Sequence, residues 1–239
     1  MWIDAHCHLE GNPALVTQQQ QEKMMSLINC QSPAEFEINH ALTKASTNHY
    51  LSAGIHPWYV RQGTFREMLP IFELVPVIGE IGLDNLWTDI PLSEQRPLFS
   101  AQLEYAAAKQ KPVILHTKGC EEEILKTIKT YPNTYLVHWY STSLWQADYL
   151  ELDCYFTIGP DLETNPHVAK LAKRIPLNRL LIESDGLNAL SWAHNQSLKE
   201  SDYLPALAKS YQLICQWRGL ELEELKELVA ENFRTFLNI

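Results

Sequence analysis

The sequence begins with MWIDAHCHLE (residues 1–10), whose side chains alternate as in a β-strand. Successive side chains of a strand point to opposite faces, so we expect Asp4, His6 and His8 on one face and the apolar residues between them on the other. A buried face with two imidazoles and a carboxylate needs partners, because each unpaired polar group costs several kcal/mol. A divalent cation would satisfy both imidazoles, since histidine is the commonest metal ligand. The alternative is an edge strand with two unrelated histidines.

The rest of the chain alternates between apolar runs of strand length and segments with helical periodicity, a pattern typical of βα units. Further strands are predicted at residues 24–29, 50–56, 76–83, 112–117, 134–139, 153–158 and 179–184. Helices are predicted at residues 34–46, 64–74, 92–109, 121–131, 144–152, 166–173, 201–218 and 221–237. Residues 10–22 favour a polar loop or a solvated helix. Eight strands in 239 residues predict one α/β domain, residues 1–239, folded as a closed (β/α)8 TIM barrel, with an open doubly wound sheet as the alternative.

Composition and charge narrow the class of protein. No apolar run approaches the roughly 20 residues of a membrane span, and the first residues lack the features of a signal peptide, so we expect a cytoplasmic protein without a membrane partner. Five scattered cysteines without a Cys-x-x-Cys pair favour reduced thiols. A net charge of −10 argues against a protein that coats long stretches of nucleic acid.

Polar side chains follow the apolar runs of several predicted strands. In a barrel, such residues at the C-terminal strand ends form the active site. The candidates in chain order are His56, Glu80, His116, His138 and Asp185. Each has a simpler explanation. Glu80 could cap a helix or form a salt bridge, and Asp185 could cap the segment that follows it. His116 and His138 could be satisfied core histidines, and His56, which precedes a proline, could begin a loop.

Together with the first strand, the strand ends provide six residues of metal-ligand type: His6, His8, Glu80, His116, His138 and Asp185. Six ligands are too many for one four-coordinate ion and suit two divalent cations bridged by a carboxylate. Nitrogen and oxygen ligands without thiolate admit zinc, manganese or magnesium, so the sequence does not select the metal.

An ordered set of motifs resembles the TatD family of metal-dependent deoxyribonucleases, within the amidohydrolase-like barrels. The motifs are DAHCH (4–8), GIHP (54–57), GEIGLD (79–84), PVILH (112–116), HWYS (138–141), ESD (183–185) and NFRTF (232–236). The resemblance implies that His6, His8 and Asp185 hold one ion, that His116 and His138 hold the other, and that Glu80 bridges them.

The departures from the family concern substrate recognition. The family usually has arginine where this chain has Lys118, which is a point charge instead of a bidentate phosphate fork. Trp139 and Tyr140 are bulkier than the usual residues after the strand-six histidine. We expect His56, Lys118, Trp139 and Tyr140 as candidate substrate contacts, the two aromatic residues by stacking on a base, with packing between strand and helix as their alternative.

These features predict a hydrolase in which two divalent cations activate a water and clamp a phosphodiester, with Glu80 and Asp185 as catalytic residues and Asp185 positioning or deprotonating the water. The expected substrate is DNA, cleaved by an exonuclease from single-stranded or frayed ends. One alternative is an amidase or esterase that acts on a small molecule with the same centre. Another is a metal-stabilised, non-catalytic subunit of a larger assembly. The sequence identifies no protein partner.

Overall fold

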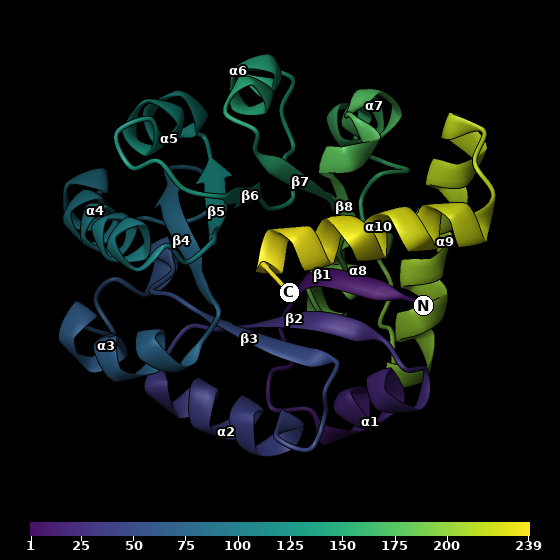
Figure 1. The fold of residues 1–239 in the computed structure, drawn as a ribbon, viewed down its shortest axis with the longest axis horizontal. Coiled ribbons are helices and arrows are strands. Elements are labelled where there is room, and N and C mark those ends of the chain that lie inside the picture. The colour runs from purple at the N-terminus through teal and green to yellow at the C-terminus, as the bar shows by residue number, and fades with distance from the viewer.

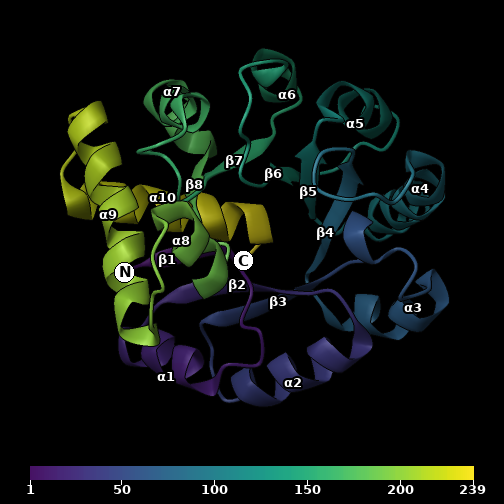
Figure 2. The same ribbon diagram turned by 180° about the vertical axis from the view of Figure 1, so that it is seen from behind.

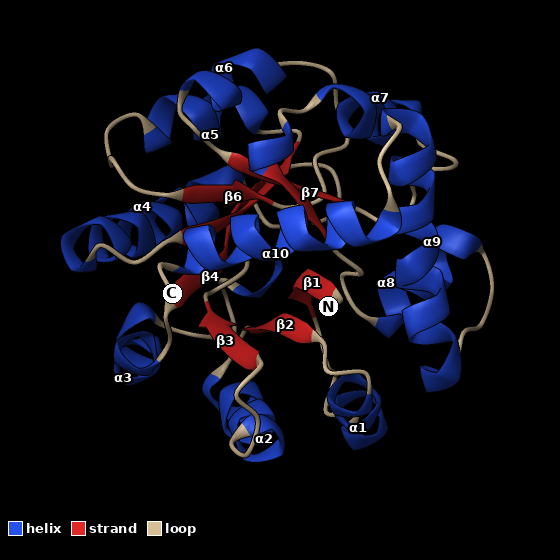
Figure 3. Cartoon of the chain, turned by 45° about the vertical axis from the view of Figure 1, so that its right-hand side comes forward, coloured by secondary structure: helices blue, strands red, loops and turns tan.

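The computed structural model describes residues 1–239 and has eight parallel strands surrounded by helices (Figures 1 and 3). The strands are β1 (Ile3–Cys7), β2 (Met25–Cys30), β3 (His49–Ala53), β4 (Val77–Asp84), β5 (Val113–Lys118), β6 (Tyr135–Val137), β7 (Tyr155–Ile158) and β8 (Leu180–Ile182). Each strand pairs in parallel with the next in the sequence. The predicted (β/α)8 barrel is confirmed.

The helices alternate with the strands and form the outer layer. They are α1 (Pro13–Gln21), α2 (Pro33–Thr43), α3 (Phe65–Leu74), α4 (Leu92–Lys109), α5 (Glu121–Ile128), α6 (Gln146–Glu151), α7 (Pro166–Arg174), α8 (Leu187–His194), α9 (Glu200–Arg218) and α10 (Leu222–Leu237). Two short 3-10 turns, η1 (Pro57–Tyr59) and η2 (Leu177–Arg179), follow β3 and precede β8. None of the helices combines the length and apolar character that a membrane span requires.

Residues 10–22, for which the sequence favoured a loop or a solvated helix, contain helix α1. The Asn12 side chain caps its first turn by accepting hydrogen bonds from the backbone N–H groups of Ala14 and Leu15, at 3.0 and 3.2 Å. The helix is not fully solvated, because Gln19 is buried and its side-chain amide donates to the hydroxyl of Tyr203 in α9. Helix α8 was not predicted, since its glycine-containing start resembles a turn.

The barrel closes between β8 and β1 through side chains as well as backbone. Asp4 accepts hydrogen bonds from the backbone N–H of Ser184 at 3.0 Å, from the Ser184 hydroxyl at 2.5 Å, and from the hydroxyl of Tyr203. The backbone N–H of Asp185 donates to the carbonyl of His6 at 3.1 Å. Burial raises the pKa of Asp4 to about 6, although these hydrogen bonds oppose the shift. Asp4 therefore joins the first and last strands next to the histidines of β1.

Asp4 does not share a face with His6 and His8, so that part of the prediction is wrong. The register of β1 against β2 shifts by one residue between Asp4 and Cys7, which is the mark of a β-bulge. The extra residue changes the alternation of side chains. As a result, Asp4 contacts Tyr203 in the outer helix layer, whereas both histidines approach the ligands from other strands.

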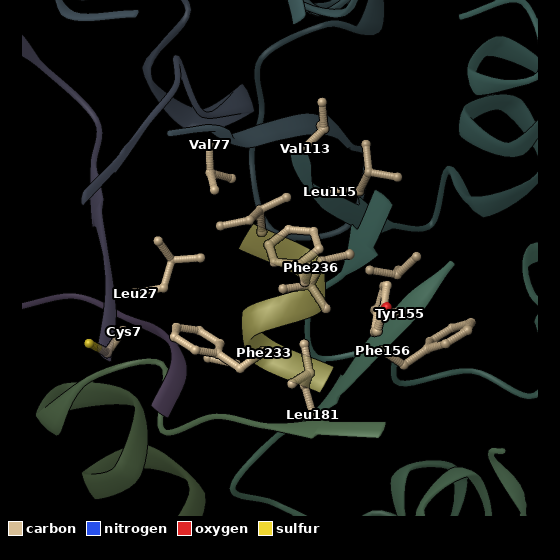
Figure 4. Close-up of a cluster of buried hydrophobic side chains, with 14 of the residues drawn as sticks. Cys7, Leu27, Val77, Val113, Leu115, Tyr155, Phe156, Leu181, Phe233 and Phe236 are labelled. Carbon is tan, nitrogen blue, oxygen red and sulfur yellow. The ribbon is translucent and has the colours of Figure 1, made fainter. Parts of the chain in front are cut away.

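Helix α10 lies across the end of the barrel where the strands begin (Figure 1). Its Asn232 side chain donates to the carbonyls of Leu177 and Leu180 at the start of β8, at 2.7 and 2.8 Å. Phe233 and Phe236 are fully buried and lie among apolar side chains of the barrel strands (Figure 4). This helix closes the end of the core at which the strands begin.

We predict that Phe236→Ala lowers the free energy of unfolding by about 3–5 kcal/mol, because it leaves a cavity in the closed end of the barrel. Urea denaturation followed by circular dichroism measures the change. Leu74→Ala is the control: Leu74 is exposed, and its loss should change stability by less than about 0.5 kcal/mol. A loss below about 1 kcal/mol for Phe236→Ala would show that α10 does not complete the core.

Candidate metal centre

The six predicted metal ligands meet at the C-terminal ends of the strands. His6 and His8 come from the end of β1, and Glu80 and His116 come from β4 and β5. His138 directly follows β6, and Asp185 follows β8. Ligand atoms lie within 4.8 Å of one another in three overlapping groups: His6, Glu80 and His138; His6, His8 and Asp185; and His56, Glu80 and His116.

Glu80 belongs to two of these groups, and both of its carboxylate oxygens lie close to histidines. Its Oε1 lies 2.7 Å from His116 Nδ1 and 2.9 Å from His138 Nε2. Its Oε2 lies on the other side, 3.5 Å from His6 Nε2 and 3.6 Å from His8 Nε2. The two oxygens of one buried carboxylate therefore face two different pairs of histidines, which is the geometry of a bridging ligand.

Two glycines allow this close approach. A Cβ atom at Gly82 would lie 1.9 Å from the carbonyl oxygen of His116, so any side chain there would push β4 away from β5. Gly186 has φ of +93°, and a Cβ there would lie 2.6 Å from the carbonyl oxygen of His8. The first glycine brings Glu80 to His116, and the second brings the segment containing Asp185 to the end of β1.

The unpaired atoms of the centre fit a metal ion. Both ring nitrogens of the fully buried His6 lack a hydrogen-bond partner, and so does Asp185 Oδ1. His6 Nε2 and Asp185 Oδ1 nevertheless lie only 3.2 Å apart. Buried polar atoms are rarely left unpaired, and a cation between a nitrogen and an oxygen lone pair would satisfy both. The site therefore suits a divalent ion that accepts imidazole and carboxylate ligands.

Charges within the centre shift its protonation equilibria. Burial alone would raise the pKa of Glu80, but His138, His56 and His116 outweigh it and hold that pKa well below the ordinary value. Burial alone would lower the pKa of His138, yet Glu80 and Glu183 raise it to about 9. Glu80 is therefore an anion at neutral pH, which is the charge state that a bridging ligand needs.

Two further carboxylates orient the histidines. His116 Nε2 donates to Asp84 Oδ2 at 2.8 Å, which leaves its Nδ1 facing Glu80. His138 Nδ1 lies 3.4 Å from both oxygens of Glu183, which leaves its Nε2 facing Glu80. Carboxylates commonly fix metal-binding histidines in this way. Asp84 has no role among the sequence-based predictions. The signal that could reveal it is its position on β4, four residues after Glu80 and two after Gly82.

His56, expected as a substrate contact, lies inside the centre. Its Nδ1 accepts a hydrogen bond from the backbone N–H of Trp58 at 3.1 Å, and its Nε2 lies 3.3 Å from Glu80 Oε1. Burial lowers the pKa of His56 to about 4, with a further contribution from His116. The ring is therefore neutral at pH 7 and carries its proton on Nε2, so it presents an N–H donor to the centre.

A cavity of about 390 Å³ lies over the metal-ligand cluster. His116, His138 and Asp185 line it, together with the predicted substrate contacts Lys118 and Trp139. Lys118 Nζ donates to the carbonyl of Trp139 at 2.5 Å. This volume falls within the range of small-molecule sites, about 300–1,000 Å³.

Tyr140, the remaining predicted substrate contact, does not reach this cavity. Its side chain is buried and packs edge-to-face against Tyr149 and Phe156, and its hydroxyl donates to the carbonyl of Leu144. The packing alternative is the one that the structure supports for Tyr140. The neighbouring Trp139 has φ of +36°, and its side chain lines the cavity.

We predict that Asp84→Asn weakens metal binding by about 10- to 100-fold, because a neutral amide oxygen accepts the hydrogen bond from His116 Nε2 more weakly than a carboxylate and leaves the imidazole less basic. Calorimetric titration with Mn²⁺ or Zn²⁺ measures the affinity. The exposed Asp89 offers a matched control, since Asp89→Asn makes the same chemical change away from the centre. Equal affinities for the two variants would show that Asp84 does not orient a ligand.

Comparison with known proteins finds similarity to TatD-related DNases and metal-dependent hydrolases. A family model described as "TatD related DNase" matches residues 3–238. A protein of Escherichia coli named "Uncharacterized metal-dependent hydrolase YjjV" is 26% identical over 262 residues, covering 100% of this chain and 98% of its own. A Rahnella protein named "3'-5' ssDNA/RNA exonuclease TatD" is 26% identical over 204 residues, covering 77% of this chain and 74% of its own.

A solved structure has the same fold. The crystal structure of the E. coli TatD homologue YjjV superimposes with a TM-score of 0.86 at 22% identity and covers 100% of this chain and 98% of its own. The family model covers nearly every residue, from the first strand to the end of the helix that closes the barrel. The chain thus belongs to the family of TatD-related DNases.

Proposed function

We propose that this protein is a metal-dependent hydrolase that cleaves phosphodiester bonds at the ends of DNA with the aid of two divalent cations. The observation that carries the proposal is the division of the Glu80 carboxylate between two pairs of histidines. His6, His8 and Asp185 would hold one ion, and His116 and His138 would hold the other. The bound cations would lower the pKa of a water molecule and neutralise charge on the phosphate oxygens.

Asp185 is best placed to act on the attacking water. Its side chain is 19% exposed and lines the cavity, whereas that of Glu80 is 3% exposed. Burial would raise the pKa of Asp185, but His6, His138 and His8 lower it, so the carboxylate is ionised and can accept a proton. We assign Asp185 to positioning and deprotonating the water, and Glu80 to bridging the two ions.

Lys118 is the cation that can contact the substrate phosphate directly. Its ammonium group has three donors, and two point to the Trp139 carbonyl and, at 3.4 Å, to the Ser141 hydroxyl. The third donor remains for a phosphate oxygen in the cavity that Lys118 lines. The neutral His56 can donate its Nε2–H to Glu80 and so hold the bridging carboxylate in place.

An end of the DNA suits this site better than the middle of a duplex. The chain has a net charge of −10, and Lys118 is the only basic residue besides histidine among those that line the cavity. Attraction for a polyanion is therefore local to the ions and Lys118. A single-stranded or frayed end can enter a cavity at the mouth of a barrel without unstacking several base pairs. The name of the Rahnella relative, an exonuclease for single-stranded DNA and RNA, supports this choice.

We predict that the protein binds two divalent ions per chain and that Glu80→Gln lowers kcat by about 100-fold or more, because the amide cannot bridge two cations. Elemental analysis and Mn²⁺ titration count the ions, and release of nucleotides measures turnover. The melting temperature of the ion-loaded variant should fall far less than its activity. Saturation of the wild-type protein at one ion would contradict the two-cation centre.

We further predict stepwise release of mononucleotides from linear single-stranded DNA and resistance of closed circular DNA of the same sequence. Digestion of both forms with Mn²⁺ or Mg²⁺, sampled over time, distinguishes them. Asp185→Asn should release nothing from either form, whereas the control Asp89→Asn should match the wild type. Rapid cutting of closed circles would contradict an end-specific enzyme.

A further inference from the structure

Three tryptophans from different segments form one wall of the cavity. Trp87 follows β4, Trp139 follows β6, and Trp192 lies in α8, after β8. The ring centroids of Trp139 and Trp192 lie 5.8 Å apart, and those of Trp87 and Trp192 lie 6.2 Å apart, both edge-to-face. We call these three residues the tryptophan row.

The row extends across the open end of the barrel. The strands follow one another in sequence order around the barrel, so β4 and β8 lie on opposite sides. Helix α8 lies over the open end when the molecule is viewed from that side (Figure 2). Trp192 thus connects the loop after β4 with Trp139, which is held by a hydrogen bond from its Nε1 to Asp161 Oδ1 at 2.7 Å.

Two members of the row are not part of the hydrophobic core. Trp87 and Trp192 are each 61% exposed, and their rings contact one another edge-to-face. Large exposed aromatic side chains that gather at one place mark an interaction site. The floor of the same cavity is formed by His116, His138 and Asp185, so the position of the row favours a substrate over a protein partner.

The side chains that line the cavity suit a ligand with one aromatic ring and one phosphate group. The aromatic wall of the cavity offers indole faces, on which any nucleobase can stack. Lys118 is the only lysine or arginine that lines it, while Asp161 and Asp185 are acidic. Flanking phosphates of a long strand would find few cationic partners here, whereas one base and one phosphodiester would find both an aromatic wall and the metal centre.

We propose that the tryptophan row binds a single nucleobase beside the phosphodiester under attack, so that the enzyme selects short nucleotide phosphodiesters by one base and one phosphate. This inference rests on the phosphodiesterase activity proposed above and adds the chemical class that the site prefers. Trp192, at the centre of the row, is the residue that determines this preference.

Two chromogenic substrates with the same leaving group test the inference. Thymidine 5′-(4-nitrophenyl phosphate) carries a base, and methyl 4-nitrophenyl phosphate carries none. In both, water attacks phosphorus, the bond to the nitrophenyl oxygen breaks, and 4-nitrophenolate leaves with the electron pair. The Mn²⁺-loaded protein should hydrolyse the thymidine ester with a kcat/KM about 5- to 140-fold higher, the range that stacking of one base provides.

Variants of the row should change this ratio in a graded way. Trp192→Leu should reduce the preference to nearly 1, and Trp192→Phe, which keeps an aromatic ring, should retain most of it. Trp145→Phe is the matched control, because Trp145 is partly exposed but does not line the cavity, and it should keep the full ratio. A wild-type ratio near 1, or an unchanged ratio in Trp192→Leu, would overturn the inference.

A binding measurement separates this inference from the proposed function. Thymidine 5′-monophosphate should quench tryptophan fluorescence in the wild type and in Trp145→Phe, and quenching should be largely lost in Trp192→Leu. Hydrolysis of neither ester would overturn the phosphodiesterase proposal, and the quenching experiment would still decide whether the row binds a base. Absence of quenching in the wild type would overturn base binding whatever the activity.

Discussion

The burial of one carboxylate among imidazoles is the constraint on which the site depends. Glu80 is ionised and almost inaccessible to solvent, and its two oxygens face nitrogen atoms from four other strand ends. An anion in such a place requires cations or protons around it, because the cost of removing its charge from water is large. The arrangement of the neighbouring backbone follows from this need. Gly82 brings the adjacent strand within reach, and the bulge in β1 turns His6 toward the same point while Asp4 faces the outer layer.

The two ends of the barrel carry different kinds of side chain. At the end where the strands begin, α10 inserts Phe233 and Phe236 into the core among apolar side chains of the strands (Figure 4). At the other end, the strands terminate in ligands whose orientation is set by carboxylates such as Asp84. Rigid strands and buried partners keep the ligands in place, so a metal ion would find a preorganised site. The hydrogen bonds of Asp4 across the β8–β1 boundary belong to the same scaffold, since they join the strands that carry His6 and precede Asp185.

Charged groups and aromatic side chains would make different contributions to the binding of a substrate. The chain is acidic as a whole, so a long polyanion gains little from its general field. In the proposed mode of binding, attraction would be concentrated at the metal-ligand cluster and Lys118, and the tryptophan row would add contacts that do not depend on charge. Stacking is tolerant of base identity, because every base has an aromatic face. A site of this kind would distinguish substrates by their size and by the presence of a ring more than by sequence.

The sequence by itself determined the barrel, because alternating strand and helix periods of the right number are a local signal. It also identified His6, His8, Glu80, His116, His138 and Asp185 as candidate ligands, since each follows an apolar run at a strand end. Only the tertiary structure decided how these residues meet. A one-residue bulge places Asp4 in contact with the outer layer, and packing against α6 buries Tyr140. Neither the bulge nor this packing can be recognised from the periodicity of the sequence. His56 lies in the metal centre, and Trp87 contacts Trp192, because closure of the barrel brings together residues that lie far apart in the chain.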